Sequence, residues 1–96
     1  MPAAPPEVVD NQAAGRFELR VGDQLAFLNY RRDGNRLHLI HTEVPAEVEG
    51  VGYGSALARS ALEHAQVAGL EVVPSCRFVR GYLERHPEYA PLVAAR

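Results

Sequence analysis

Residues 41–57 read HTEVPAEVEGVGYGSAL, and this stretch decides the fold. It leads from a β-like segment through three alternating glycines, Gly50, Gly52 and Gly54, into a helix-like segment. Glycine adopts backbone angles that other residues avoid, and it leaves room for a ligand to approach the backbone. The N–H groups at a helix start lack helical partners and carry partial positive charge. The stretch therefore predicts a strand-to-helix turn that either binds a phosphate or pyrophosphate or is a tight turn without a ligand.

The predicted phosphate donors are the backbone N–H groups of residues 51–55, with the Ser55 hydroxyl as a further donor. Two familiar phosphate loops do not fit this stretch. A Walker A loop needs Gly-Lys-Ser/Thr, which does not occur here. A Rossmann loop needs G-x-G-x-x-G, whereas this loop reads GVGYG, and 96 residues are too few for a dinucleotide-binding fold.

The chain before this stretch predicts an antiparallel meander of three strands. Residues 16–21 (RFELRV) alternate apolar and polar side chains, and residues 21–44 supply two further β-like runs. Gly-Asp and Asp-Gly-Asn sequences separate the runs and favour hairpin turns. Residues 1–14 hold three prolines and no periodicity, so they predict a flexible lead-in with at most one short strand near Val8 and Val9. Residues 15–96 are then a single domain.

After the glycines, the hydrophobic period changes to that of a helix of roughly four turns ending at Gly69. The apolar run Leu70–Val73 predicts a short strand, parallel to the strand that ends at Val44 and terminated by Pro74. Ser75 is the expected cap of a second helix. The apolar stripe of that helix comprises Phe78, Val79, Tyr82 and Leu83.

Composition excludes several classes of function. The chain is 47% hydrophobic and 23% charged, which is typical of a globular domain. Its formal charge is −2, and its ten basic residues are scattered between acids, so no basic face for nucleic acid is evident. No apolar run is long enough to span a membrane. The single cysteine precludes an intrachain disulfide, and the N-terminus does not read as a signal peptide, so we expect a cytoplasmic protein.

Residues 41–89 resemble the small, minimal members of the GCN5-related N-acetyltransferase (GNAT) superfamily, in which a strand, a glycine-rich loop and a helix bind acetyl-coenzyme A. The family motif reads Gln/Arg-x-x-Gly-x-Gly/Ala; Gly52 and Gly54 match its glycines, whereas Glu49 stands at the Gln/Arg position. The resemblance implies an α+β, GNAT-like fold and an N-acetyltransferase that transfers acetyl from acetyl-coenzyme A to an amine of an unknown small molecule or peptide. It also implies two splayed strands with a slot for the thioester. The implied coenzyme-binding residues are Thr42, Val44, Gly50, Val51, Gly52, Tyr53, Gly54 and Ser55.

Four residues are candidates for catalysis. Cys76 follows the parallel strand and is expected in the first turn of the second helix, where the dipole favours a thiolate; it either receives the acetyl group, lines the slot or is an inert buried residue. His41 and Glu43 are two apart on a strand, so they share a face, and either is a candidate base for the amine or a plain polar residue at a strand end. By the resemblance, Tyr82 returns a proton to the departing thiolate, although its place in the apolar stripe favours packing.

The four histidines do not predict a metal site. His38 and His41 are three apart on a strand and are expected on opposite faces, and His64 and His86 belong to different helices. A non-catalytic module that binds acyl-coenzyme A is the rival to the enzyme, and a small interaction domain with an empty glycine turn is a third possibility. Larger members of the superfamily that the chain resembles have extra helices near the first strands, which shape the acceptor site. The short hairpins after Arg16 leave no room for them, so we expect an open groove or a partner subunit in their place. A monomer or a small homo-oligomer is expected.

Overall fold

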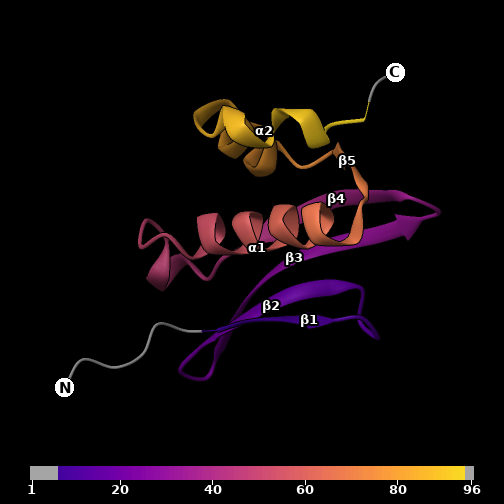
Figure 1. The fold of residues 1–96 in the computed structure, drawn as a ribbon. Coiled ribbons are helices and arrows are strands. Elements are labelled where there is room, and N and C mark those ends of the chain that lie inside the picture. Colours follow the sequence, from indigo (N-terminus) through magenta and orange to yellow (C-terminus); the bar gives the residue numbers. More distant parts are fainter. Residues whose placement is uncertain (1–6, 95–96) are drawn as a thin grey trace.

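The computed structural model describes residues 7–94, which form one five-stranded sheet with helices packed on it (Figure 1). The strands are β1 (Val8–Asn11), β2 (Arg16–Val21), β3 (Gln24–Asp33), β4 (Arg36–Glu43) and β5 (Glu71–Pro74). The α-helices are α1 (Tyr53–Ala68) and α2 (Arg77–Arg85), and the 3-10 helices are η1 (Ala46–Val48) and η2 (Pro87–Leu92). The strands lie in chain order, antiparallel from β1 to β4 and parallel between β4 and β5. The order of strands and α-helices from β2 to α2 is the predicted one, and η1 was not predicted.

The antiparallel part of the sheet contains the predicted three-stranded meander and one further short strand. This strand, residues 8–11, lies at the place in the lead-in where a short strand near Val8 and Val9 was expected, and it pairs with β2, with Val8 opposite Leu19. The Tyr30 hydroxyl donates a hydrogen bond to Asp10 Oδ1 at 2.6 Å, which ties this short strand to β3. The rest of that lead-in at residues 1–6 lies outside the described residues.

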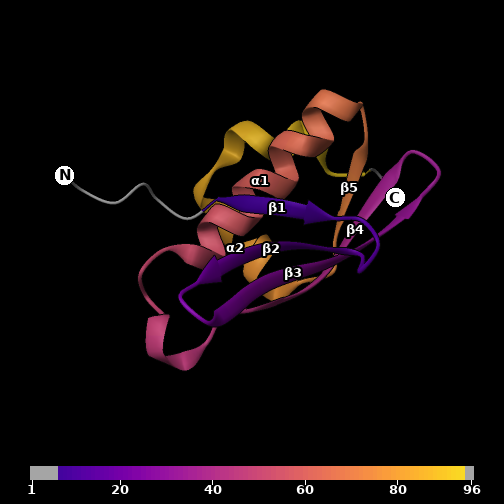
Figure 2. The same cartoon turned by 90° about the horizontal axis from the view of Figure 1, so that it is seen from below.

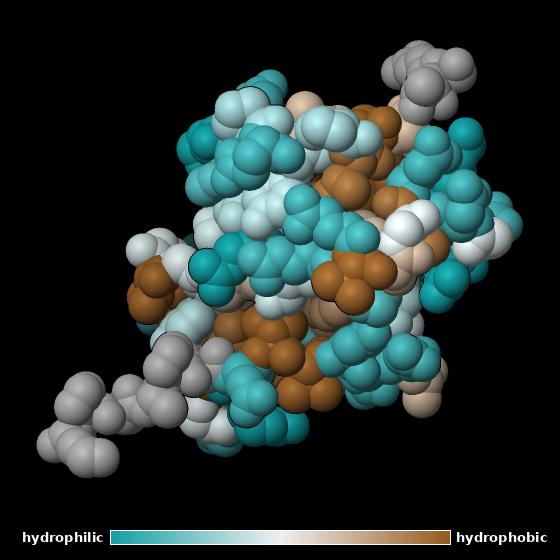
Figure 3. Space-filling view, viewed as in Figure 1, coloured by the Kyte–Doolittle hydropathy of each residue, from teal (hydrophilic) through white to brown (hydrophobic). Residues whose placement is uncertain are grey.

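One face of the sheet carries the hydrophobic core, and α1 covers it (Figure 2). The buried strand residues share this face: Phe17, Leu19, Ala26, Leu28, Leu37, Leu39 and Val72. α1 packs on them with a stripe at helical spacing, Leu57, Ala58, Ala61, Leu62 and Ala65. The helix ends at Gly69, whose φ of 71° is the left-handed cap predicted there. On the α1 side, the molecular surface is mostly hydrophilic with separate hydrophobic patches (Figure 3).

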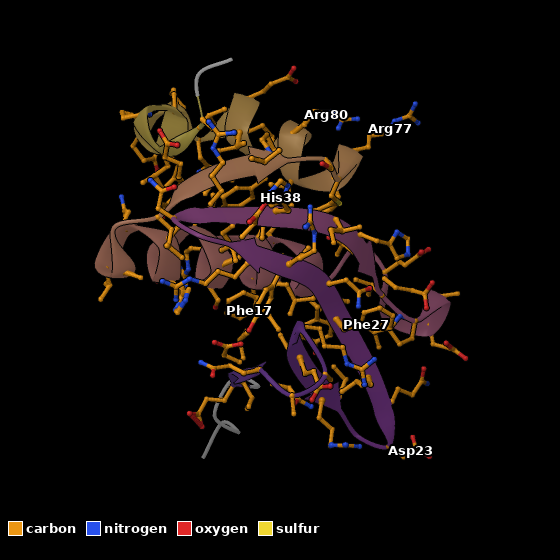
Figure 4. The ribbon with its side chains drawn as sticks, turned by 90° about the vertical axis from the view of Figure 1, so that its right-hand side faces the viewer. Phe17, Asp23, Phe27, His38, Arg77 and Arg80 are labelled. Atoms are coloured by element: carbon orange, nitrogen blue, oxygen red, sulfur yellow. The ribbon has the colours of Figure 1, made fainter. Side chains whose placement is uncertain are left out.

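The other face of the sheet carries no fully buried side chain within residues 7–94. Phe27 lies on this open face, whereas Phe17 lies on the core face toward α1 (Figure 4). The Arg16 guanidinium carbon is 4.9 Å from the centre of the Phe27 ring, and Arg16 also pairs with Glu18. Arg16 thus contacts both an aromatic ring and a carboxylate of neighbouring positions on the open face.

A β-bulge in β4 changes which side chains reach each face. Asn29 of β3 pairs with His41 and Tyr30 pairs with Leu39, so Ile40 is an extra residue without a partner. His38 and His41 consequently lie on the same, open face, and the prediction that they point to opposite faces is wrong. Past the bulge, Thr42 pairs with buried Leu28 and lies on the core face.

Pairing between β4 and β5 ends before β4 does. The last parallel pair is Leu39 with Pro74, whereas β4 continues to Glu43. The Leu39 carbonyl accepts hydrogen bonds from the N–H groups of Ser75 and Cys76, both at 3.0 Å, and the chain then turns into α2. Residues 40–43 therefore have no β5 partner, which is the parting of strands that the resemblance implies.

The start of α2 differs from the prediction. The N-cap is Cys76 rather than Ser75, and no side chain donates or accepts a capping hydrogen bond. Cys76 is still extended, with φ −83° and ψ 127°, so it precedes the first turn instead of lying in it. The reason is the pair of hydrogen bonds to the Leu39 carbonyl, which keep residues 75 and 76 alongside β4.

Candidate functional site

The three alternating glycines have two different physical causes. Gly50 and Gly52 have φ values of 81° and 103°, which other residues rarely adopt, so they form the turn between η1 and α1. Gly54 has helical backbone angles, and a larger residue would not fit there unless Phe78 shifted. A Cβ at this position would lie 2.8 Å from Phe78 Cζ of α2. The loop is thus shaped both by its own turn and by the close approach of α2.

The start of α1 presents unpaired donors next to this loop. Its first hydrogen bond runs from Ala56 N to Gly52 O at 3.0 Å. The N–H groups of Tyr53, Gly54 and Ser55 come before it and have no helical acceptor. These groups are among the predicted phosphate donors.

A cavity of about 420 Å³ opens between the end of β4, the glycine loop and α2. Its lining is Val44, Val48, Glu49, Gly50, Gly52, Tyr53, Gly54, Ser55, Phe78 and Arg85. The cavity therefore brings together most of the predicted coenzyme-binding residues. Two are not part of the lining: Val51 is 63% exposed, and Thr42 contacts Cys76 instead.

Four lining residues are not among the predicted coenzyme-binding residues: Val48, Glu49, Phe78 and Arg85. Glu49 belongs to the glycine-loop motif, whereas Val48, Phe78 and Arg85 enter the cavity because η1 and α2 lie against the loop. Phe78 and Arg85 are seven residues apart, which places them on one face of a helix. Nothing in the sequence indicates that this face of α2 meets the start of α1, so the signal lies only in the tertiary structure.

Cys76 and Thr42 meet where β4 and β5 part. Thr42 Oγ1 lies 3.2 Å from Cys76 Sγ, and either atom is the donor. Cys76 is only 6% exposed and is not part of the cavity lining. The thiol therefore lies in the gap between the strands, held by a hydroxyl on the core face of β4.

His41 and Glu43 share a face, as predicted, and it is the open one. His41 Nε2 lies 3.5 Å from Glu43 Oε1, with the two side chains 60% and 63% exposed. The neighbouring Phe27 ring meets the His41 ring edge-on at 6.5 Å between centroids. The two candidate bases are thus on the opposite side of β4 from Thr42.

Tyr82 lies in the core, outside the cavity lining. It is 4% exposed, stacks on His86 with centroids 4.0 Å apart and packs near Tyr89. Burial raises the pKa of its phenol, with a smaller contribution from the Tyr89 hydroxyl. This buried position matches the packing interpretation of Tyr82.

Within residues 7–94, no group of histidine, cysteine, aspartate or glutamate side chains is arranged to hold a metal ion. Within the same residues, no helix is both long and apolar enough to cross a membrane.

The glycine turn, the parted strands and the adjoining cavity match the arrangement that the resemblance implies for an acetyl-coenzyme A site. The family model of GCN5-related N-acetyltransferases matches residues 16–92. The solution NMR structure of a GCN5-like candidate N-acetyltransferase from Staphylococcus aureus superposes with a TM-score of 0.73 at 28% sequence identity, over 94% of this chain and 89% of that one. This chain belongs to the GCN5-related N-acetyltransferase family. The resemblance and the fold class inferred from the sequence are confirmed, and activity of the N-acetyltransferase type follows at the level of the family.

Proposed function

We propose that this protein is an acetyl-coenzyme A-dependent N-acetyltransferase that acts on an amine of a small molecule or peptide. The observation that carries the proposal is the cavity at the glycine turn, next to the gap where β4 runs past β5. A cytoplasmic location accords with the single cysteine. The acceptor is an amine of unspecified structure.

In this proposal, backbone groups bind the coenzyme. The N–H groups of Tyr53, Gly54 and Ser55 bind the pyrophosphate, since they are unpaired at the positive end of α1. Residues 40–43 of β4, which lack a β5 partner, offer backbone groups to the pantetheine arm. Acetyl-coenzyme A supplies an activated acyl group as a thioester. The protein contributes chiefly by holding it beside the amine.

An ammonium group must lose a proton before it can attack a carbonyl. Glu43 and His41 are the residues assigned to accept that proton, directly or through water. Both side chains are exposed on the open face, next to the part of β4 that has no β5 partner. If Glu43→Gln loses turnover while its coenzyme affinity is unchanged, the assignment is supported. If the variant keeps full activity, Glu43 is excluded as the base.

Cys76 has two roles compatible with its position. It lines the acyl pocket, with Thr42 fixing its sulfur at 3.2 Å, or it accepts the acetyl group as a thiolate, releases the coenzyme thiol and is restored when the amine removes the acetyl. Intact-mass measurement after mixing with acetyl-coenzyme A distinguishes them. The second role is established by two results together: an acetyl adduct forms on the wild type but not on Cys76→Ala, and Cys76→Ala loses turnover.

The rival proposal is a non-catalytic module that binds acyl-coenzyme A. It is favoured by the exposure of His41 and Glu43 and by the core position of Tyr82. A module of this kind binds the coenzyme yet releases no free thiol with any amine offered.

Calorimetric titration of acetyl-coenzyme A and desulfo-coenzyme A tests the common basis of both proposals. Gly52→Ala is the site variant, and Gly34→Ala is its matched control, because both glycines have positive φ and no neighbouring atom near an added Cβ. We expect Gly52→Ala to lose binding and Gly34→Ala to retain it. An absence of binding in the wild type refutes the coenzyme site, and a thiol-release screen with amines then separates the enzyme from the module.

A further inference from the structure

Two hollows flank the first turns of α1. The larger is the cavity of about 420 Å³ described above, and Arg85 of α2 lines it. The smaller measures about 210 Å³ and is lined by Gly52, Ser55, Ala56 and Arg59. The hollows share Gly52 and Ser55, and each contains one arginine.

Arg85 is the cation of the larger hollow. A Cβ on Gly81 would lie 3.6 Å from Arg85 Nη1, so the guanidinium lies back over the bare surface of that glycine. Within residues 7–94, Arg85 forms no ion pair with a carboxylate. The only other charged residue of the lining is Glu49, so the cavity without Arg85 would carry an acid alone. Arg85 thus makes this cavity compatible with an anion.

Arg59 is the cation of the smaller hollow. It is seven residues after Gly52 and four after Ser55, so all three lie along one side of α1. Its Nε lies 4.0 Å from Glu63 Oε2, and the two side chains are 64% and 55% exposed. An exposed helical pair at this distance is weak, so Arg59 remains available to a stronger anionic partner.

Coenzyme A carries phosphate at two places: the pyrophosphate and the 3′-phosphate of the ribose. We propose that Arg85 binds the pyrophosphate and that Arg59 binds the 3′-phosphate, so that the smaller hollow distinguishes coenzyme A from dephospho-coenzyme A. This inference rests on the proposed function. The loop itself carries no positively charged side chain and contributes the acidic Glu49. The inference therefore assigns the positive charge near the phosphates to the two arginines.

The test is a matrix of affinities measured by calorimetry with coenzyme A and dephospho-coenzyme A. We expect Arg85→Gln to weaken both ligands by about fivefold to tenfold, because it loses one charge-assisted contact at an exposed site. We expect Arg59→Gln to weaken coenzyme A by a similar factor and to leave dephospho-coenzyme A unchanged. Glu63→Gln frees Arg59, and should tighten coenzyme A alone.

Arg77→Gln is the matched control, since Arg77 is an exposed arginine of α2 outside both hollows (Figure 4). It should leave both affinities within a factor of about two once salt is present to screen long-range charge. Thermal unfolding checks that each variant retains its fold.

Three results overturn the inference. Equal weakening of both ligands by Arg59→Gln refutes the 3′-phosphate assignment, and wild-type affinity in Arg85→Gln refutes the pyrophosphate assignment. A loss in Arg77→Gln as large as in the other variants attributes the effect to net charge. These results differ from failure of the proposed function, in which the wild type binds neither ligand.

Discussion

Replacing Ser55 by aspartate should strengthen the fold while weakening the coenzyme site. Ser55 is the third residue of α1, where a carboxylate interacts favourably with the unpaired N–H groups and the positive end of the helix. That interaction is worth about 0.3 to 1 kcal/mol, which raises the midpoint of thermal unfolding by about 2–6 °C in a domain of this size. The same carboxylate lines both hollows, where it opposes a phosphate.

The loss of binding follows from Coulomb's law. A unit charge about 5 Å from a phosphate charge costs about 1 to 3 kcal/mol for effective dielectric constants between about 80 and 20. The acetyl-coenzyme A affinity of Ser55→Asp should therefore fall by about fivefold to 100-fold, and the deficit should shrink as salt is added. Ser60→Asp on the same helix is the control; it lies about 7.5 Å further along the axis and should leave affinity nearly unchanged.

Calorimetry and thermal unfolding on the same samples provide the readouts. A variant that is as stable as the wild type and binds acetyl-coenzyme A equally well at low salt refutes the glycine loop as the phosphate site. A variant that loses stability along with affinity refutes the stabilising role assigned to the helix start.

Three further predictions concern packing and ionisation. The first is the substitution Gly54→Ala, made both in the wild type and in a Phe78→Ala background. It should increase the free energy of unfolding less in the wild type, by up to about 1 kcal/mol in urea unfolding, because only there does the added Cβ meet the Phe78 ring at 2.8 Å. Equal effects in both backgrounds contradict the contact. Burial and the hydrogen bond to Asp10 raise the pKa of Tyr30 from 10.0 to about 12, so its contribution to stability is present below pH 10 and is lost as the pH rises to about 12; Tyr30→Phe should flatten this decline in urea unfolding, and an unchanged decline rules out Tyr30 as its source. Tyr82→Phe should leave turnover unchanged, because the phenol lies outside the cavity lining, whereas lost turnover at unchanged coenzyme affinity makes Tyr82 the proton donor.

Much of the fold could be predicted because its signals are local. Glycines at positive φ, the change of hydrophobic period and the cap at Gly69 each depend on a few neighbouring residues, and the structure places α1 where they indicate. The parallel strand and its end at Pro74 were also predictable, since a helix separates it from β4. The glycine-loop side of the candidate coenzyme cavity follows from these elements.

What could not be predicted depends on contacts between distant segments. Alternation along β4 gives no sign that Ile40 is unpaired, yet that bulge decides the faces of His41 and Thr42. Ser75 is a good capping residue by type, but its N–H and that of Cys76 bind the Leu39 carbonyl, which delays the helix by one residue. The entry of Arg85 into the cavity likewise requires the packing of α2 against the loop.

The open face of the sheet has a consequence for how this protein can diverge. Its outward side chains contribute little to the core, so substitutions there typically alter stability by no more than about 0.5 kcal/mol. The same face carries His41 and Glu43 beside the gap between β4 and β5. Evolution or design can therefore remodel the surface around those residues while the glycine turn and the packed face of the sheet stay the same.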